Sequence, residues 1–245
     1  MAEYDAIGEL YSEVKTAPFR VHLEAYTVER WAGDVRGARV LDLACGDGFY
    51  SRRFMAAGAA ETLGVDASAE MVALGRRVEA AAPRGCRYLH ADVSALGVIG
   101  EFDLVVAAYL LNYARTRAEL RRFADVMYAN LRPGGRLVGV NEYNDDGVTG
   151  TRDFARHGFL KIGPSPYVEG AEVTCEFLLG EGRNFSITNY YWRPETYLEI
   201  LADAGFRNPA WHLFEVSPQG RSSFPPGYWD DLLSPPPMKV FVAER

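Results

Sequence analysis

Two short segments carry residues whose types and spacing suit the binding of a nucleoside. Residues 40–51 read VLDLACGDGFYS, an apolar run that leads into Gly46 and Gly48. Residues 63–68 read LGVDAS, a second apolar run that ends at Asp66, which follows Gly46 by 66 − 46 = 20 residues. A βαβ unit places a carboxylate at this spacing beside a ribose that is held over the first turn. The sequence therefore predicts a site for a ligand that contains a nucleoside.

The residues of the glycine turn separate two classes of such ligands. A dinucleotide-binding turn has the pattern G-x-G-x-x-G/A, whose third small residue allows the helix to pack closely on the strand. Counted from Ala44, that third position is Phe49, which disfavours a dinucleotide and hence a dehydrogenase. Gly46 and Gly48 instead let the backbone approach an amino-acid arm, whose carboxylate suits the free N–H groups at a helix start.

The pattern Asp42-x-Ala44-x-Gly46-x-Gly48 resembles the first motif of class I S-adenosylmethionine-dependent methyltransferases, with Ala44 where that family often has its first glycine. Three later segments resemble further motifs of the family in the correct order: residues 90–93, 102–114 and 131–143. The resemblance implies S-adenosyl-L-methionine as the cofactor, S-adenosyl-L-homocysteine as its product, and the fold of this family.

Strands that alternate with helices predict an α/β protein with a doubly wound parallel sheet. The resemblance implies a mostly parallel, Rossmann-like sheet of seven strands, including a final antiparallel hairpin. We expect a single domain over residues 1–245 that comprises, in order, an N-terminal helical cap, a cofactor-binding core, an inserted lid and the C-terminal part of the core, at 1–35, 36–143, 144–193 and 194–245.

Local signals define several elements of this domain. Ser68 is the predicted N-cap of a helix that ends near Ala81, Thr116 opens a second helix with a capping box, and Pro194 opens a third. The segments EVTCEFLL and FSITNYYW predict a β-hairpin lid. Six prolines within residues 217–237 predict a long loop, in which Phe224, Tyr228 and Trp229 are candidate anchors.

Ligands in such sheets bind beyond the carboxyl ends of the strands, so residues that follow strands are candidates. We expect Asp66 to accept hydrogen bonds from both ribose hydroxyls; helix capping is its alternative role. The resemblance implies that Asp92 meets the adenine amino group, with turn formation as the alternative. Met71 would cover the adenine or pack in the core. Tyr11 and Arg20 are candidates for the methionine arm. The predicted cofactor-binding residues are Tyr11, Arg20, Ala44, Gly46, Asp66, Ala67, Met71, Asp92, Val93 and Tyr109.

Aromatic and polar residues after the fourth and fifth predicted strands predict the acceptor site, to which the lid could add Tyr190, Tyr191 and Trp192. They describe a flat, largely apolar pocket with a few hydrogen-bonding groups, which suits a planar heteroaromatic molecule. Glu142 is the candidate catalytic base, although an acidic N–H acceptor would need none. The predicted acceptor-binding residues are Asn112, Tyr113, Asn141, Tyr143 and Trp192.

Three longer segments resemble one branch of the family. The segments YDAIGELYSEVKTAPFRVHLEAYT, DLACGDGFYSR and NYYWRPETYLEILADAGF are together similar to azapteridine N-methyltransferases that complete toxoflavin biosynthesis. This resemblance implies sequential N-methylation of a didesmethyl azapteridine, which is a flat bicyclic ring. The alternatives are an O- or C-methyltransferase of another secondary-metabolite pathway and a noncatalytic S-adenosylmethionine-binding protein.

Composition bounds the partners. The net charge of −7 disfavours a nucleic-acid substrate. The three cysteines lack C-x-x-C spacing and the four histidines lie far apart, so we expect no metal. No segment offers the ~18 consecutive apolar residues of a membrane span, and the N-terminus lacks a basic start, so we expect a cytoplasmic protein without a membrane partner.

Overall fold

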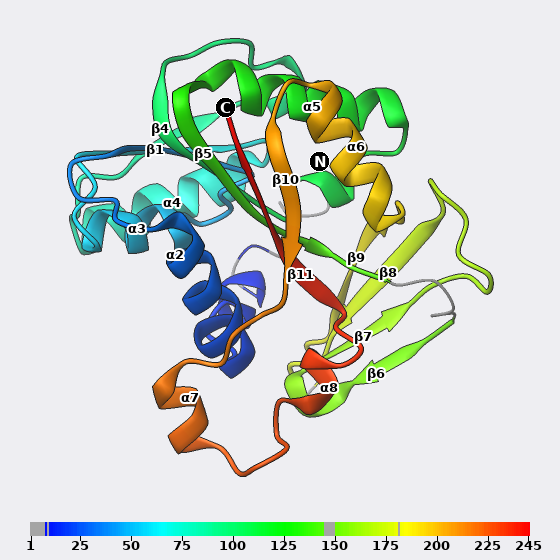
Figure 1. The fold of residues 1–245 in the computed structure, drawn as a ribbon. Helices are drawn as coiled ribbons and strands as arrows, with labels where there is room; N and C mark the ends of the chain where they lie inside the picture. The colour runs from blue at the N-terminus through cyan, green and yellow to red at the C-terminus, as the bar shows by residue number, and fades with distance from the viewer. Residues whose placement is uncertain (1–7, 9, 145–149, 181) are drawn as a thin grey trace.

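The computed structural model describes residues 8, 10–144, 150–180 and 182–245. Seven strands form the main sheet in the order β10-β11-β5-β4-β1-β2-β3 (Figure 1). Pairing is parallel from β5 to β3, whereas β11 runs antiparallel to both β5 and β10. This topology confirms the predicted mostly parallel sheet of seven strands and its final antiparallel hairpin. The strands are β1 (Arg39–Leu43), β2 (Glu61–Asp66), β3 (Arg87–His90), β4 (Phe102–Ala108), β5 (Leu131–Glu142), β10 (Arg207–His212) and β11 (Met238–Glu244).

Helices cover both faces of the main sheet, with α3 and α4 on one face and α5 and α6 on the other (Figure 1). Side chains of successive strand residues point to opposite faces, so Val40 of β1 joins the core beneath α3 while Leu41 joins the core beneath α5. The sheet is therefore doubly wound. The helices are η1 (Arg20–Ala25, a π-helix), α2 (Tyr26–Ala32), α3 (Phe49–Ala56), α4 (Ala69–Ala81), α5 (Arg117–Asn130) and α6 (Pro194–Asp203), with three short 3-10 turns at η2 (Val93–Ala95), η3 (Leu111–Tyr113) and η4 (Ala155–His157).

The predicted helix starts are confirmed in detail. The Ser68 hydroxyl accepts a hydrogen bond from the backbone N–H of Met71 at 3.2 Å, and α4 ends at Ala81. The Thr116 hydroxyl accepts from the backbone N–H of Glu119, also at 3.2 Å. Pro194 is the first residue of α6. These N-caps satisfy helix N–H groups that would otherwise lack partners. The start of the predicted N-terminal helices, residues 1–7 and 9, lies outside the described residues.

A second sheet of four antiparallel strands lies beside the main sheet (Figure 1). Its strands are β6 (Arg152–Phe154), β7 (Phe159–Ile162), β8 (Glu172–Phe177) and β9 (Phe185–Tyr190). The pair of β8 and β9 is the predicted hairpin. Strands β6 and β7 were not predicted because runs of three and four residues are too short to show an alternating pattern.

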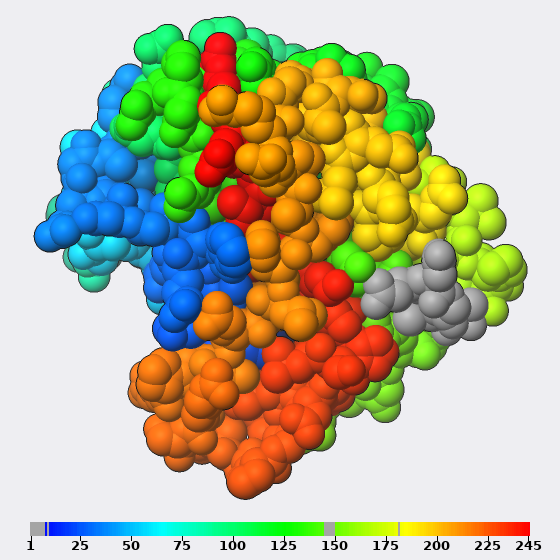
Figure 2. Space-filling model, viewed as in Figure 1, coloured from blue at the N-terminus to red at the C-terminus, as the bar shows by residue number. Residues whose placement is uncertain are grey.

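The prediction of a long loop over residues 217–237 is wrong in part. Helix α7 (Pro218–Ser223) and helix α8 (Asp230–Leu233) lie within it. The Ser217 hydroxyl accepts from the backbone N–H of Gly220 at 3.0 Å, and Pro218 occupies the first helical turn, where a missing N–H is tolerated. Aromatic rings of the segment do anchor it, since Trp229 is buried and packs on Phe224. In Figure 2 this orange and red segment forms the lower part of the visible face.

Candidate cofactor and acceptor site

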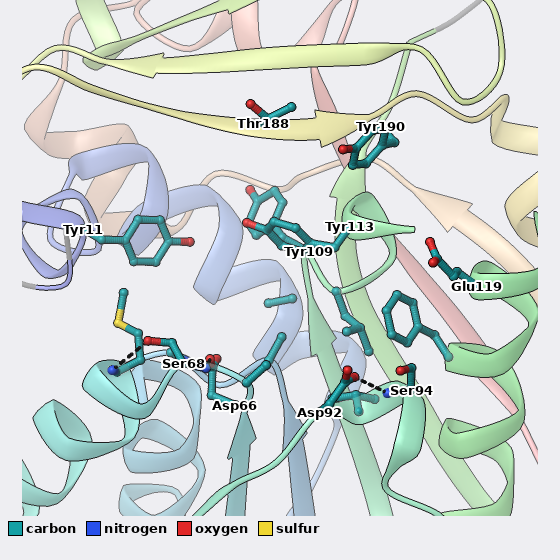
Figure 3. Close-up of a pocket in the computed structure, with 18 of the residues that line it drawn as sticks. Tyr11, Asp66, Ser68, Asp92, Ser94, Tyr109, Tyr113, Glu119, Thr188 and Tyr190 are labelled. Atoms are coloured by element: carbon teal, nitrogen blue, oxygen red, sulfur yellow. Dashed lines mark hydrogen bonds between the residues drawn. The ribbon is translucent and has the colours of Figure 1, made fainter. Parts of the chain in front are cut away.

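A cavity of about 380 Å³ opens at the carboxyl ends of β1 to β4. The order of strands reverses between β1 and β4, which is the point where ligands bind in open α/β sheets. In the view of Figure 3 the ends of the main-sheet strands lie below the cavity and strand β9 crosses above it. The polar residues labelled there come from both sides of the cavity, and include Asp66, Ser68, Asp92 and Ser94 below and Thr188 and Tyr190 above.

The turn after β1 leaves room for a ligand beside its backbone. Ala44 and Gly46 have the left-handed φ values of 56° and 56°. A side chain at Gly46 would meet no atom within 4 Å, so the space next to this glycine is open. At Gly48, where φ is 83°, a Cβ would instead lie 2.2 Å from the Tyr88 hydroxyl. Gly46 thus fits close approach of a ligand, whereas Gly48 is required by packing and backbone conformation.

Asp66 lies at the end of β2 and joins this turn to the start of α4. One carboxylate oxygen accepts from the backbone N–H of Gly46 at 2.7 Å, and the other accepts from the backbone N–H of Ser68 at 2.9 Å. Burial raises the pKa of this carboxyl group. Each carboxylate oxygen can accept a second hydrogen bond. Asp66 therefore ties the two turns together but is not the helix cap, which is Ser68. It still fits the predicted role toward ribose hydroxyls.

Asp92, Val93 and Met71 also line the cavity. One Asp92 oxygen accepts from the backbone N–H of Ser94 at 2.8 Å, so the turn-forming role is present in the structure. The adenine contact of Asp92 stays a prediction. Met71 is buried and belongs to the hydrophobic core as well as to the cavity wall, so its core role is present and its contact with adenine stays a prediction.

Asp42 on β1 is buried behind the glycine turn. Its carboxylate accepts two hydrogen bonds from Ser51 of α3, one from the backbone N–H at 2.9 Å and one from the hydroxyl at 2.7 Å. Burial raises the pKa of Asp42 to about 6, although the Ser51 hydrogen bonds oppose the shift. Asp42 thus holds strand and helix on either side of the turn at an electrostatic cost.

We expect an Asp42→Asn variant to remove a pH-dependent loss of stability. Because the folded-state pKa of about 6 exceeds the ordinary 3.8, the contribution of Asp42 is fully present below about pH 4 and is lost as pH rises through 6. The loss amounts to at most about 3 kcal/mol by pH 7. Urea unfolding from pH 4 to 8 should show that the free energy of unfolding of the variant increases relative to that of the wild type as pH rises. A difference that is constant with pH would contradict this.

Lys15 is a cavity residue that the sequence reasoning missed. It is only 7% exposed, and its ammonium lies 4.9 Å from the ring centre of Tyr11. Within the described part of the chain, no carboxylate oxygen lies within 4.0 Å of this ammonium. Lys15 follows Tyr11 by four residues, and helical spacing from Tyr11 could have identified it. Its charge suits the carboxylate of a methionine arm.

Arg20, which was predicted for that arm, does not line this cavity. Its guanidinium pairs with Glu24, and both side chains are buried. The Glu24 carboxylate also accepts from the hydroxyls of Tyr50 at 2.8 Å and Tyr109 at 2.6 Å. Burial alone would raise the pKa of Glu24, but the charges of Arg20 and Lys15 together with the tyrosine hydrogen bonds lower it.

A second, inner cavity of about 20 Å³ lies between the main sheet and the four-stranded sheet. Tyr11 and Tyr109 line both cavities. Glu142, the predicted base, belongs to the inner one, where a carboxylate oxygen lies 3.4 Å from the Lys161 ammonium and the other accepts from the Asn189 amide at 3.0 Å. Burial lowers the pKa of Lys161. The remaining lining residues are Phe19, Arg20, Phe159, Cys175, Phe177, Ile187 and Met238.

Of the predicted acceptor residues, Tyr113 lines the larger cavity. The other four line neither cavity. Tyr143 packs against Trp211 with ring centres 5.3 Å apart, and the Trp192 indole donates to the carbonyl of Ala114 at 2.9 Å. The four are Asn112, Asn141, Tyr143 and Trp192. Several residues that line the larger cavity were not among the predicted site residues, including Lys15, Ser94, Arg115, Glu119, Phe123 and Thr188.

Among residues 8, 10–144, 150–180 and 182–245, no three His, Cys, Asp or Glu side chains gather closely enough to hold a metal ion. None of the helices found there has both the length and the apolar character needed to cross a membrane.

Comparison with known proteins relates this site to one family. A family model described as a methyltransferase domain matches residues 40–135, the segment that holds Gly46, Asp66 and Asp92. A demethylmenaquinone methyltransferase from Clavibacter sepedonicus is 32% identical over 140 residues, which make up 56% of this chain and 55% of that protein. The chain spans about half the length of the curated relatives it matches.

Solved structures share the fold over nearly the whole chain. An S-adenosylmethionine-dependent methyltransferase from Mesorhizobium loti has 24% identity and a TM-score of 0.67, covering 95% of this chain and 100% of that one. CalS10 with bound S-adenosylmethionine, an amino pentose methyltransferase from Micromonospora echinaspora, has 22% identity and a TM-score of 0.59, covering 100% and 94%. The fold is that of class I S-adenosylmethionine-dependent methyltransferases. The matches to known methyltransferases support the prediction of such an enzyme.

Proposed function

We propose that this protein is an S-adenosylmethionine-dependent N-methyltransferase of a small planar heteroaromatic molecule. The observation that carries the proposal is the joint lining of one cavity by the glycine turn, by Asp66 and Asp92, and by the aromatic rings of Tyr11, Tyr109 and Tyr113. The matched methyltransferase segment supplies the first part of this lining. The open space beside Gly46 fits a ligand that approaches the backbone.

The chain offers a group for each part of the cofactor. Asp66 would hold the ribose, Asp92 the adenine, and Lys15 the methionine carboxylate. When bound, S-adenosylmethionine supplies an electrophilic methyl group on a sulfonium, whose charge disappears as the methyl is transferred. The acceptor nitrogen would form the new bond to carbon, the electrons of the broken C–S bond would stay on sulfur, and the proton of the nitrogen would pass to Glu142 or to water.

Alignment and exclusion of water would contribute more to this reaction than strong acid–base chemistry. Strand β9 lies over the cavity and brings Thr188 and Tyr190 to it, so the four-stranded sheet is suited to exclude water (Figure 3). Glu142 would act as base only for an acceptor whose N–H is not already acidic. Its carboxylate is held by Lys161 and Asn189.

The finer proposal is sequential N-methylation of a didesmethyl azapteridine in toxoflavin biosynthesis. Its support is the resemblance of the N-terminal segment, the glycine turn and the segment around Pro194 to that branch, together with the flat aromatic walls of the cavity. Stacking on tyrosine faces suits an electron-poor bicyclic ring. CalS10, which shares the fold, is an amino pentose methyltransferase and so likewise acts on a small molecule.

The test is methylation of that ring by the purified protein. Incubation with S-adenosylmethionine and a didesmethyl azapteridine in the presence of EDTA should yield mono- and dimethyl products by mass spectrometry, because the proposed reaction needs alignment and no metal. An Asp66→Ala protein serves as the control for cofactor-dependent turnover. Methylation of an unrelated hydroxyl compound with no methyl gain on the azapteridine would overturn the proposed substrate.

A further inference from the structure

The inner cavity contains buried polar atoms that have no partner. Among the described residues, neither Nε of Arg20 nor Oδ1 of Asn189 has a hydrogen-bond partner. Both side chains line the cavity, and each residue is 3% exposed. Leaving a buried donor or acceptor unpaired is costly, so such groups usually meet a ligand or an ordered water. One cavity thus presents an unpaired N–H donor and an unpaired oxygen acceptor.

A third polar group adds to this pair. The Lys161 residue is 1% exposed, and its ammonium donates to the carbonyl of Pro237 at 2.7 Å and lies beside Glu142. An ammonium has three N–H donors, so Lys161 can donate one further hydrogen bond toward the cavity. Asn189 is fixed in orientation, because its amide N–H₂ donates to Glu142 and its oxygen is thereby turned away from that carboxylate.

The charges around the cavity are balanced within the protein. Arg20 pairs with Glu24, and Lys161 pairs with Glu142. A charged ligand group would leave one buried charge without compensation, which is strongly unfavourable. A neutral group that carries both a donor and an acceptor is therefore the best match.

The size of the cavity limits what can enter. A volume of about 20 Å³ holds little more than one water molecule. A whole bicyclic ring does not fit, whereas the edge of a ring whose body lies in the cavity of about 380 Å³ does. Tyr11 and Tyr109 line both spaces, so the two cavities adjoin each other at these side chains.

We infer that the inner cavity is an acceptor subsite that binds a neutral cyclic amide or imide edge, in which an N–H group stands next to a carbonyl oxygen. The ring N–H donates to Oδ1 of Asn189, and the carbonyl oxygen accepts from Arg20 or Lys161. Asn189 is a specificity-determining residue of this subsite. The inference rests on the proposed function for the identity of the ligand as the methyl acceptor, and its binding test does not need turnover.

Binding of two probe compounds tests the subsite directly. Pteridine-2,4-dione has the required edge, and quinoxaline has a similar bicyclic size without it. In calorimetry with S-adenosylhomocysteine present, the dione should bind wild-type protein at least about tenfold more tightly than quinoxaline, since a polar site rejects a ligand that leaves its groups unpaired. The Asn189→Leu variant should lose about tenfold in affinity for the dione and nothing for quinoxaline.

A control variant on the same strand separates this role from structural damage. Ser186 of β9 is exposed and lines neither cavity, so Ser186→Ala should bind both probes as the wild type does. Thermal melting checks the fold of each variant, and Asn189→Ala replaces the leucine variant if leucine is not accommodated. Equal affinity of wild type and the Asn189 variant for the dione would overturn the inference and indicate a cavity filled by water.

Kinetics distinguish failure of the subsite from failure of the proposed function. With an acceptor that the wild-type protein methylates, Asn189→Leu should raise the KM for the acceptor about tenfold and leave the KM for S-adenosylmethionine unchanged. Turnover with an unchanged acceptor KM would overturn the subsite and leave the proposed function intact. A different result would separate the two in the other direction. If the wild type binds the dione but methylates no azapteridine, and the Asn189 variant does not bind the dione, the subsite is supported and the proposed substrate is overturned.

Discussion

Replacing Asp66 with alanine should weaken binding of S-adenosylmethionine by at least about tenfold. A hydrogen bond from a ligand hydroxyl to a carboxylate contributes about 1.5–3 kcal/mol, and tenfold corresponds to about 1.4 kcal/mol. The variant also removes the acceptor for the backbone N–H groups of Gly46 and Ser68 and so loosens the turn itself. Isothermal titration calorimetry measures the affinity, and unchanged binding would exclude a ribose contact.

A matched control for this loss lies at the opposite end of the sheet. Asp103 also accepts a backbone N–H, from Arg39 at 2.7 Å, and it lines neither of the two cavities described above. Asp103→Ala should therefore lower stability without changing cofactor affinity. If both variants lose affinity equally, the effect of Asp66 is a general consequence of destabilisation.

The pH dependence of binding gives a second measure of the same group. Burial raises the pKa of Asp66, so its carboxylate takes up a proton at a higher pH than an ordinary aspartate does. Because the neutral acid is the weaker acceptor, affinity for S-adenosylmethionine should fall on acidification earlier than the usual aspartate range predicts. In Asp66→Asn this part of the pH dependence should be absent, since the amide does not titrate.

The sequence predicted the half of the site that depends on local spacing. Ala44, Gly46, Asp66 and Asp92 all line the larger cavity because each lies at or just beyond the carboxyl end of a strand, and parallel strands end at the same edge of the sheet. The strand, turn and helix signals around these residues lie within a few positions of one another. The positions of these residues therefore depend little on long-range packing.

Prediction of the acceptor-binding residues was less accurate, because it depended on which face of the sheet each side chain points to. Alternation along β5 sends Glu142 toward the four-stranded sheet, whereas the next residue, Tyr143, packs on Trp211 of β10. Sequence pattern alone does not say which neighbour covers each face at the end of a strand. The inner cavity likewise needs Lys161 from β7, a four-residue strand that left no recognisable pattern.

Lys15 and Arg20 near the N-terminus show that sequence spacing also failed to predict side-chain direction in a helical segment. Lys15 lines the cavity and Arg20 does not, although both stand near Tyr11 in the sequence. The chain turns after Lys15, and η1 is a π-helix, so the side-chain spacing that starts at Tyr11 does not continue to Arg20. Arg20 instead faces Glu24 in the interior.

This buried pair gives the largest stability effect that we expect. The Glu24→Gln variant should lower the free energy of unfolding by about 3 kcal/mol or more, because it leaves the Arg20 guanidinium buried without a counter-charge. The glutamine keeps the size of the side chain and an oxygen that can accept from Tyr50 or Tyr109, so the loss reports the missing charge. Urea unfolding at pH 7 measures it.

An exposed ion pair on the same part of the chain is the control. Glu13 lies 2.8 Å from Arg183, with both side chains almost half exposed. Glu13→Gln should cost no more than about 1 kcal/mol, since water screens such pairs. Similar losses in the two glutamine variants would contradict a special role for burial. A double variant, Arg20→Leu with Glu24→Gln, should recover stability relative to Glu24→Gln alone, because no unpaired charge remains.

Acidification provides the last check on Glu24. Its pKa lies below the ordinary 4.5 because the charge of Arg20 and the tyrosine hydrogen bonds outweigh the effect of burial. A lowered folded-state pKa means that the stabilisation is present above the ordinary value and is lost as pH falls through the folded value. The gap in stability between wild type and Glu24→Gln should therefore narrow as pH falls below about 4. Since Glu24 also accepts from the Tyr109 hydroxyl, whose ring lines both cavities, the same variant should alter ligand binding where Glu13→Gln does not.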